Sequence, residues 1–319
     1  MQQQIDRFSD VHAHAQSLRS WRQTYSQISA GTLDSSLHQV TTPRAHLFRE
    51  QMNQRVVQHG VAPAGHVCFA VPISAPGRVC MQGRDADDNS VFLLQGGDEF
   101  MFHMPNGMDM LSMTFERTLY DEVVALLGAQ TDFDKLLRQS VIQVPTRRLQ
   151  HARRRMVAMF SEAVHTREMA GSSEHERELE RAMLEELLLL IADPSSTGRP
   201  RDTQSAHSFI VDRCHHIAVA DGSAAPSVIE LCQQLHVSRR TVQNSFRNVA
   251  ETTPLHYLRS LRLNGVRREL TSTVPTKVSI GDAAARWGFF HLSHFAADYQ
   301  ELFGELPSQT RRLAVGVTC

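Results

Sequence analysis

The sequence predicts an α+β protein in which an antiparallel β domain is followed by helices and then by a separate all-helical domain. Residues 33–116 consist of short apolar or alternating segments, such as HVCFAVPI and SVFLLQ, separated by the turn sequences APGR, RDADDN and MPNG. This spacing is typical of antiparallel strands. Helical periodicity takes over from residue 117. A segment at 193–204 that contains two prolines and a glycine is typical of an exposed linker.

These observations divide the chain into three parts. We expect an N-terminal domain at 1–192, with a cupin-like barrel or sandwich at 33–116 and helices at 117–192. The linker follows at 193–204, and an all-α domain occupies 205–319. With 319 residues, of which 41% are hydrophobic and 21% charged, the chain can form two domains that each have a core.

The composition argues against several classes of protein. The first residues, MQQQIDRFSD, lack the apolar segment of a secretion signal, and no run approaches the roughly 18 apolar residues of a membrane span. We therefore expect a cytoplasmic protein that binds no membrane. The five cysteines are scattered without a C-x-x-C pair, which predicts reduced thiols. No metal site or cofactor is indicated, because histidines and carboxylates do not cluster at ligand spacing.

The strand pattern is clearest in the segment DMLSMTFE at 109–116. Leu111, Met113 and Phe115 alternate with the residues between them, so they are expected to face one core while their neighbours face the other way.

The second helix before the linker carries a broad apolar stripe. Ser173 and Glu176 have the spacing of a capping box at its start. Apolar residues then recur at steps of four, with further leucines beside them: Leu179, Met183, Leu187 and Ile191. Because the stripe is wider than one core face needs, these four residues are a candidate contact surface for a homodimer. Packing on the β domain is the alternative.

Two segments of the last domain share one spacing. The first, IELCQQLHVSRRTVQNSFR, covers 229–247, and the second, AAARWGFFHLSHFAADYQELFG, covers 283–304. Each has a small residue five positions before an apolar one, and then two buried-type residues four apart. The matching pairs are Cys232 and Val237 with Ala284 and Phe289, then Val242 and Phe246 with Phe295 and Tyr299. This spacing predicts two helix-turn-helix units, with turns near His236 and Gly288.

The polar residues between the buried positions are the candidate DNA contacts. They are Ser238, Arg239, Arg240, Gln243, Asn244 and Arg247 in the first unit, and His291, Ser293 and His294 in the second. Arg240, Gln243 and Asn244 suit base edges, because arginine pairs with guanine and the amides pair with adenine. Arg247 and the flanking Arg259 suit phosphates.

A single helix is expected to connect the two units. Pro254 follows Thr253 at a favoured helix start, and apolar residues then recur at steps of three and four up to Leu270. Held about 34 Å apart, two recognition helices can enter successive major grooves on one face of DNA.

These motifs resemble the DNA-binding domain of the AraC/XylS family of bacterial transcription regulators over about residues 205–312. The most specific match is GFFHLSHFAADYQELFGELPSQTRR, in which Gly288-Phe289, His294-Phe295, Phe303-Gly304 and Pro307 fall at the family's signature positions. Within the family, RLNGVRREL and WGFFHLSHFAADYQ look most like ethanolamine-utilisation regulators.

The resemblance implies a function and a set of partners. It implies a sequence-specific regulator that binds double-stranded promoter DNA, contacts RNA polymerase and acts as a homodimer without catalysing a reaction. It also implies that the N-terminal domain serves sensing and dimerisation, and that a small-molecule effector binds there. The sequence does not indicate which residues bind the effector.

The second unit departs from the family pattern. Where arginine is common in its recognition helix, this sequence has Ala297 followed by Asp298. Between Ser227 and Leu270 the chain has seven arginines against three acidic residues, whereas after Leu270 it has four basic and four acidic residues. We therefore expect the first unit to dominate affinity and specificity.

Two other functions remain open. One is an enzyme fused to a DNA reader, as in alkyl-transfer repair proteins, but the four-cysteine zinc site or reactive-cysteine motif that it needs is absent from the sequence. The other is a regulator without an effector, controlled by a protein partner.

Overall fold

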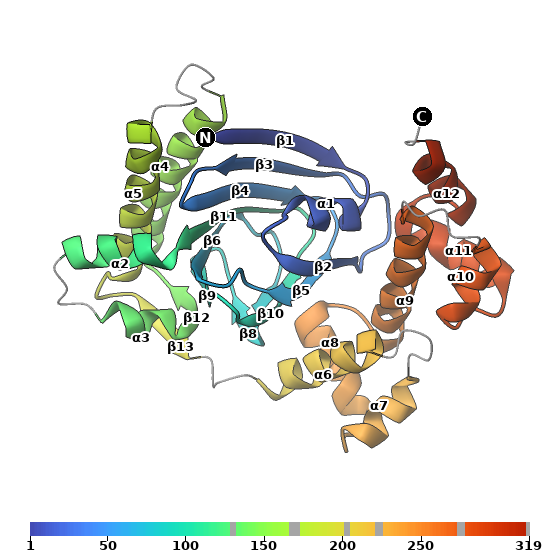
Figure 1. Ribbon diagram of the computed structural model, residues 1–319. Coiled ribbons are helices and arrows are strands. Elements are labelled where there is room, and N and C mark those ends of the chain that lie inside the picture. Colours follow the sequence, from blue (N-terminus) through green and yellow to red (C-terminus); the bar gives the residue numbers. More distant parts are fainter. Residues whose placement is uncertain (128–131, 166–172, 201–204, 221–225, 273–277, 317–319) are drawn as a thin grey trace.

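Figure 1 shows a computed structural model of the chain, in which a β domain has helices along one side and a helical domain packed against another. The structure describes all residues except 128–131, 166–172, 201–204, 221–225, 273–277 and 317–319. The predicted α+β fold, with an antiparallel β domain first and an all-helical region last, is confirmed.

Two antiparallel sheets form the β domain. One has the strand order β1 (Gln2–Phe8), β3 (Ser35–Thr41), β4 (Ala45–Met52), β11 (Met108–Glu116), β6 (His66–Ser74), β9 (Ser90–Gln95), β12 (Gln139–Gln143) and β13 (Thr197–Pro200). The other has the order β2 (Arg22–Gln27), β5 (Val56–Val61), β10 (Glu99–Met104), β7 (Val79–Met81) and β8 (Arg84–Ala86). Phe48 and Met110 of the first sheet share a buried cluster with Tyr25 and Phe102 of the second, so the two sheets face one another.

The β structure extends beyond the predicted 33–116. β1 and β2 precede this range, with the short helix α1 (Val11–Ser17) between them, and β12 and β13 follow it. The linker prediction at 193–204 is wrong for 197–200, because these residues pair with β12 at the edge of the larger sheet. The composition of residues 193–204 could not indicate this pairing, because it depends on the free backbone N–H and C=O groups at the edge of a strand far away in the sequence. Residues 201–204 of the predicted linker lie outside the described residues.

The larger sheet is covered on both faces. Leu111, Met113 and Phe115 of β11 belong to the core under the helices, while Met110 belongs to the core between the sheets. The predicted alternation is therefore confirmed. Both faces of β11 are buried, because one faces the helices and the other faces the second sheet.

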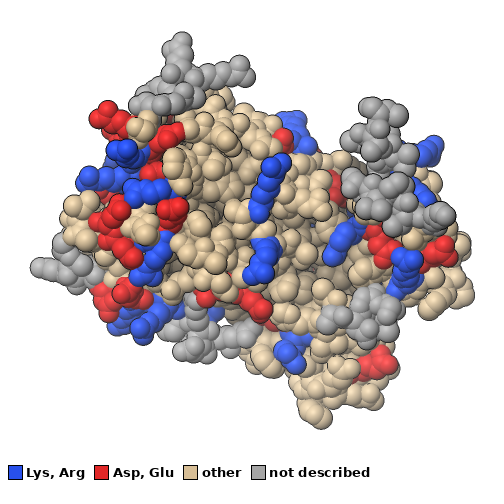
Figure 2. Space-filling model, in the orientation of Figure 1, with Lys and Arg blue, Asp and Glu red and all other residues tan. Residues whose placement is uncertain are grey.

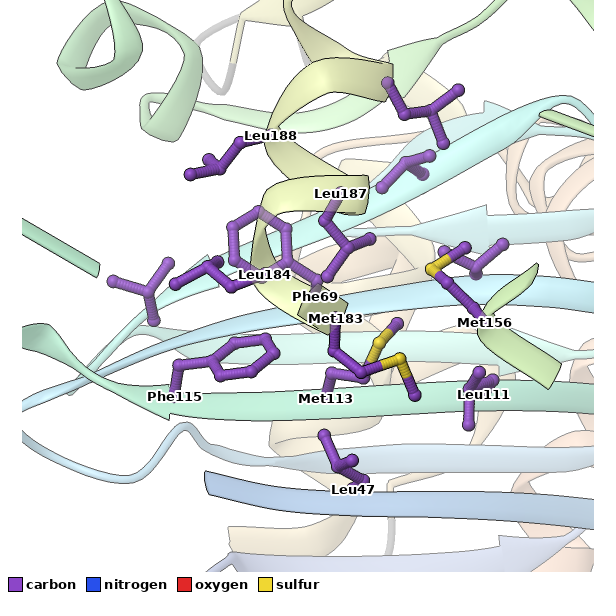
Figure 3. Packing of buried hydrophobic residues seen from close by; sticks show 14 of the residues in the cluster. Leu47, Phe69, Leu111, Met113, Phe115, Met156, Met183, Leu184, Leu187 and Leu188 are labelled. Carbon is purple, nitrogen blue, oxygen red and sulfur yellow. The ribbon is translucent and has the colours of Figure 1, made fainter. Parts of the chain in front are cut away.

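Four helices, α2 (Arg117–Leu126), α3 (Phe133–Leu137), α4 (Thr146–His165) and α5 (Ser173–Ile191), lie on the outer side of this sheet (Figure 1). Figure 3 shows Met183, Leu184, Leu187 and Leu188 of α5 pointing towards the side chains of the sheet. The predicted homodimer surface is therefore wrong in its residues. Its members are all buried in the chain's own core: Leu179, Met183, Leu187 and Ile191. The stripe is wide because α5 packs against the sheet and also against α4 and α2.

The outer surface of these helices is charged. Figure 2 shows basic and acidic side chains interspersed on the side of the molecule that carries α2, α4 and α5. Arg155 of α4 pairs with Glu186 of α5 at 2.9 Å, and Arg148 pairs with Asp193 at 3.1 Å. Positive charge on these helices is thus offset locally. No helix among the described residues is both long and apolar enough to cross a membrane.

The helical domain contains α6 (Ala206–Ala220), α7 (Val228–Gln234), α8 (Arg239–Ala250), α9 (Pro254–Thr271), α10 (Ile280–Arg286), α11 (Leu292–Phe303) and α12 (Pro307–Gly316). It has two cores, and α9 contributes to both. The first half of α9 packs Tyr257 and Leu261 with α6 to α8, and its second half packs Val266 and Leu270 with α10 and α11. Thr253 caps α9 and Pro254 occupies its first turn, as predicted. One continuous helix therefore links the two units.

Candidate nucleic-acid interface

The first helix-turn-helix unit consists of α7 and α8. His236, between the helices, has a left-handed backbone with φ of 52°, a conformation uncommon for residues other than glycine. Val237 N donates to Cys232 O at 3.0 Å and closes the turn, and Ser238 caps α8. The predicted turn near His236 is confirmed.

The second unit, α10 and α11, repeats this geometry. Gly288 has φ of 76° at the turn, and Phe289 N donates to Ala284 O at 2.9 Å. In both units, the spacing of five residues between a small and an apolar residue corresponds to the hydrogen bond that closes the turn. Glycine, which is unfavourable inside a helix, is favourable here because it adopts positive φ without a steric cost.

The apolar side of α8 anchors it and leaves a polar side in solvent. Val242 and Phe246 are fully buried, as predicted. The opposite residues are all exposed: Ser238, Arg239, Arg240, Gln243, Asn244 and Arg247. Among the described residues, the arginine, glutamine and asparagine side chains of this group form no hydrogen bond or ion pair with another residue. Their donors and acceptors are therefore available to a ligand.

The solvent side of α11 has a different chemistry. Phe295 and Tyr299 are buried, as predicted, and His291, Ser293 and His294 are exposed near the start of the helix. Ala297, one turn further, is also exposed. This surface can form hydrogen bonds, but it contains no arginine or lysine between 291 and 303.

Arg259 does not share the freedom of the arginines on α8. Arg259 lies on α9, and its Nη1 donates to Oδ1 of Asp298 on α11 at 3.1 Å. In the structure Arg259 neutralises the acidic residue of the second recognition helix. Its phosphate contact remains a prediction. The two paired residues are 39 positions apart in the sequence, so a local sequence pattern could not reveal the pairing.

Two more arginines of α9 hold the β domain. Arg267 is buried and pairs with Asp10 Oδ2 at 2.5 Å and with Glu305 Oε1 at 2.8 Å. Arg268 Nε donates to His12 Nε2 at 3.1 Å. Burial, opposed by Asp10 and reinforced by the two arginines, lowers the pKa of His12 to about 4, so His12 accepts this bond as a neutral ring. These positive charges therefore take part in the contact between the helical domain and the β domain.

The β domain also contacts the carboxyl end of α8. Arg55 Nη1 donates to Ala250 O at 2.8 Å, and the same guanidinium pairs with Glu251. Arg78 donates to Asn248 O. The last carbonyls of a helix have no partner within it and carry partial negative charge, so the two arginines stabilise this end of α8 and fix its position.

The carboxyl end of α11 has a parallel contact. Gln27 Nε2 donates to Leu302 O at 2.7 Å, and Gly31 N lies 3.1 Å from the same oxygen. Gln27 also exchanges two backbone hydrogen bonds with the side chain of Asn264 in α9, at 3.0 and 2.8 Å. Gly304, which ends α11, lies so close that a Cβ would be 2.2 Å from Thr32 Oγ1. The β domain thus holds both recognition helices by their carboxyl ends.

A cavity of about 50 Å³ lies between the two sheets. Its walls are mostly aromatic and aliphatic, with a few polar side chains: Trp21, Gln23, Tyr25, Phe48, Glu50, Gln58, Cys68, Phe69, Ala70, Met81, Phe92, Leu94, Phe100, Phe102, Met110 and Ser112. Sequence reasoning identified none of these as ligand residues, since they come from strands far apart in the chain. No group of three or more His, Cys, Asp or Glu side chains in the described residues is arranged to hold a metal ion.

Comparison with known proteins places the match in the helical domain. A family described as a helix-turn-helix domain matches residues 231–313. The chain is 30% identical over 125 residues to a probable thc operon regulatory protein of Rhodococcus erythropolis, which is 39% of this chain and 38% of that protein. It is 32% identical over 151 residues to a XylDLEGF operon transcriptional activator of Pseudomonas putida, 47% of this chain and 45% of that protein.

One solved structure matches a larger share of the chain than these relatives do, but at lower sequence identity. The AraC-like transcriptional activator CuxR matches 89% of this chain and 100% of its own, with a TM-score of 0.42 and 16% identity. A probable AraC family transcriptional regulator from Rhodopseudomonas palustris matches 33% of this chain and 97% of its own, with a TM-score of 0.31 and 26% identity. The chain spans less than half the length of the two curated relatives described above.

Proposed function

We propose that this chain, a member of the AraC/XylS family of transcription regulators by its helix-turn-helix domain, binds promoter DNA under the control of a small molecule held in its N-terminal domain. The observation that carries the proposal is the exposed side of α8, where Arg240, Gln243 and Asn244 have no partner among the described residues. These side chains match the donors and acceptors of guanine and adenine in the major groove.

Control by the small molecule runs through β2. Gln23 and Tyr25 of this strand line the cavity, and Gln27 contacts both α9 and α11. A ligand in the cavity that favours one position of β2 therefore also favours one position of the DNA-binding domain. Such a ligand shifts the equilibrium only by the difference between its affinities for the two positions.

Two macromolecular partners belong to the proposal. The Pseudomonas putida relative is named an operon transcriptional activator, and we extend activation, with contact to RNA polymerase, to this chain. We also propose a homodimer. Its contact surface excludes Leu179, Met183, Leu187 and Ile191, since they are buried within one chain.

The proposal is tested by selecting binding sites from a random double-stranded DNA pool with the full-length protein at physiological salt. We expect a recovered motif whose strongest element depends on Arg240. Recovery of no motif, with or without candidate ligands, would contradict sequence-specific regulation. Arg154, an exposed residue of α4, provides the matched control, because Arg154→Ala removes the same charge far along the chain from α8 and should leave the motif unchanged.

A further inference from the structure

A buried carboxylate lies in the wall of the cavity between the sheets. Glu50 of β4 is 1% exposed and lines the cavity. Its Oε1 accepts from Tyr25 OH at 2.7 Å and lies 3.1 Å from His14 Nε2. Its Oε2 has no hydrogen-bond partner among the described residues. Because a carboxylate oxygen accepts hydrogen bonds and Glu50 lines the cavity, this oxygen is open to a donor from within the cavity.

Aromatic rings form much of the remaining wall. Trp21 packs edge-on against Phe100 and Phe48, with ring centroids 5.6 and 6.2 Å apart. Phe92 and Phe102 form a second edge-on pair at 5.0 Å, and all five rings line the cavity. Aromatic faces attract cations through their quadrupole, and the attraction is larger where water is excluded.

The charge of the lining favours a cation over an anion. No lysine or arginine is among the residues that line the cavity, and its other polar side chains, such as Gln23, Gln58 and Ser112, are uncharged. An anionic ligand would therefore lie beside Glu50 without a compensating positive group from the walls. A cation would satisfy Oε2 and would contact the rings.

The size of the cavity limits the ligand to a small molecule. Its volume is about 50 Å³, a few times the roughly 10–15 Å³ that one water needs, so it suits a ligand of few heavy atoms.

We propose that the cavity binds a small organic ammonium cation, with the charged nitrogen against Glu50 Oε2 and the carbon atoms against the aromatic side chains. This inference rests on the proposed function, because it gives the chemical class of the effector. The ammonium replaces the missing donor of Glu50, and the rings replace part of its hydration shell.

Three probes of nearly equal size test the charge preference on the full-length protein. We would titrate n-propylammonium, 1-propanol and propionate up to about 20 mM, since a ligand with few heavy atoms binds weakly. Calorimetric titration gives affinity, and the thermal unfolding midpoint gives an independent readout, because a ligand that binds only the folded state raises it. We expect n-propylammonium to bind at least about tenfold more tightly than either other probe, since a tenfold ratio is 1.4 kcal/mol of binding free energy.

Glu50→Gln should remove this preference, because the amide keeps the shape but not the charge. Glu180 provides the matched control, since it is also 1% exposed but does not line the cavity. Glu180→Gln should therefore keep the preference for n-propylammonium. If Glu50→Gln does not fold, the three-probe comparison on the unmodified protein still decides the proposal.

Three outcomes would overturn the proposal: equal binding of 1-propanol, tighter binding of propionate, or no binding of any probe. Each can be separated from failure of the proposed function, because site selection on DNA without ligand is measured independently. A protein that recovers a DNA motif but ignores n-propylammonium would retain the regulatory function and lose only this ligand class.

Discussion

The recognition helices α8 and α11 are both twelve residues long and are anchored at the same spacing, yet they present different side chains to solvent. Counted from the first residue of each helix, the second, fifth and sixth positions hold Arg240, Gln243 and Asn244 in α8 but Ser293, Ala296 and Ala297 in α11. The repeat therefore preserves the packing of the unit but not its exposed chemistry. The spacing of the buried apolar residues determines how each helix packs. The exposed residues between them are free to differ.

The surroundings of the two helices differ in the same direction. The arginines on α8 have no protein partner among the described residues, whereas Asp298 on α11 is neutralised by Arg259. We infer that the first unit provides most of the sequence reading and that the second contributes position and a few hydrogen bonds. Four experiments test this difference between the two units.

The largest effect is expected from truncating the aromatic anchors. Phe246 and Phe295 are buried in separate cores, so Phe246→Ala and Phe295→Ala should each cost about 3–5 kcal/mol of stability. Hydrogen exchange should show loss of protection confined largely to the unit that carries the change. Phe246→Ala should abolish specific DNA binding, and Phe295→Ala should weaken it less. Equal losses of DNA binding would contradict dominance of the first unit.

Removing one predicted base contact should have the next largest effect. Arg240→Ala should weaken binding to the selected site by about 1–3 kcal/mol, the value of a good base contact, and weaken binding to random DNA much less. Ser293→Ala, at the corresponding position of α11, should cost less at the selected site. The measurement is a titration of both DNA types at fixed salt. The same loss on random DNA would identify Arg240 as a phosphate contact.

Acid should weaken the contact between the β domain and the first unit. Burial, with Arg55 adding to it, lowers the pKa of His103 to about 3, and burial also lowers the pKa of His59 and His215. His103 lies beside Tyr257 of α9, with ring centroids 6.1 Å apart.

The direction follows from proton uptake. Below the unfolded value of about 6.5, the unfolded chain binds a proton that the folded chain does not, so stability is lost as pH falls from 6.5 towards 3. His103 alone should account for about 2 kcal/mol at pH 5, since one pH unit corresponds to about 1.4 kcal/mol. Urea unfolding at pH 7.5 and 5 measures the loss. His103→Gln should reduce it, and the exposed control His294→Gln should not.

The smallest effect is expected at Asp298. Asp298→Asn should release Arg259 and add one positive charge near the second recognition helix. Because an exposed ion pair contributes only about 0–1 kcal/mol to stability, folding should be nearly unchanged. DNA affinity should rise modestly, with a salt dependence steeper by up to about one phosphate contact. No change in either quantity would place Arg259 away from the DNA backbone.

Several features followed from the sequence alone. The spacing from Cys232 to Val237 and from Ala284 to Phe289 predicted both turns, because one backbone hydrogen bond fixes that separation. Thr253 and Pro254 predicted the start of α9, and alternation predicted the two faces of β11. These are local relations, in which the residues that define a structure lie within a few positions of one another. The DNA-contact roles of the exposed residues on α8 and α11 remain predictions.

Other features depend on contacts between segments that are distant in the sequence. The seven arginines between Ser227 and Leu270 are one group in sequence, but the fold gives them different surroundings. Three lie on the free side of α8, one pairs with Asp298, one lies over the Phe289 ring, one is buried against Asp10 and one donates to His12. The stripe on α5 became core because a sheet was available to cover it. The cavity around Glu50 exists because residues between Trp21 and Ser112, from strands of both sheets, meet in space. The sequence determines the charge and hydrophobicity of each residue. Which residue contacts it depends on which chain segments the fold brings together.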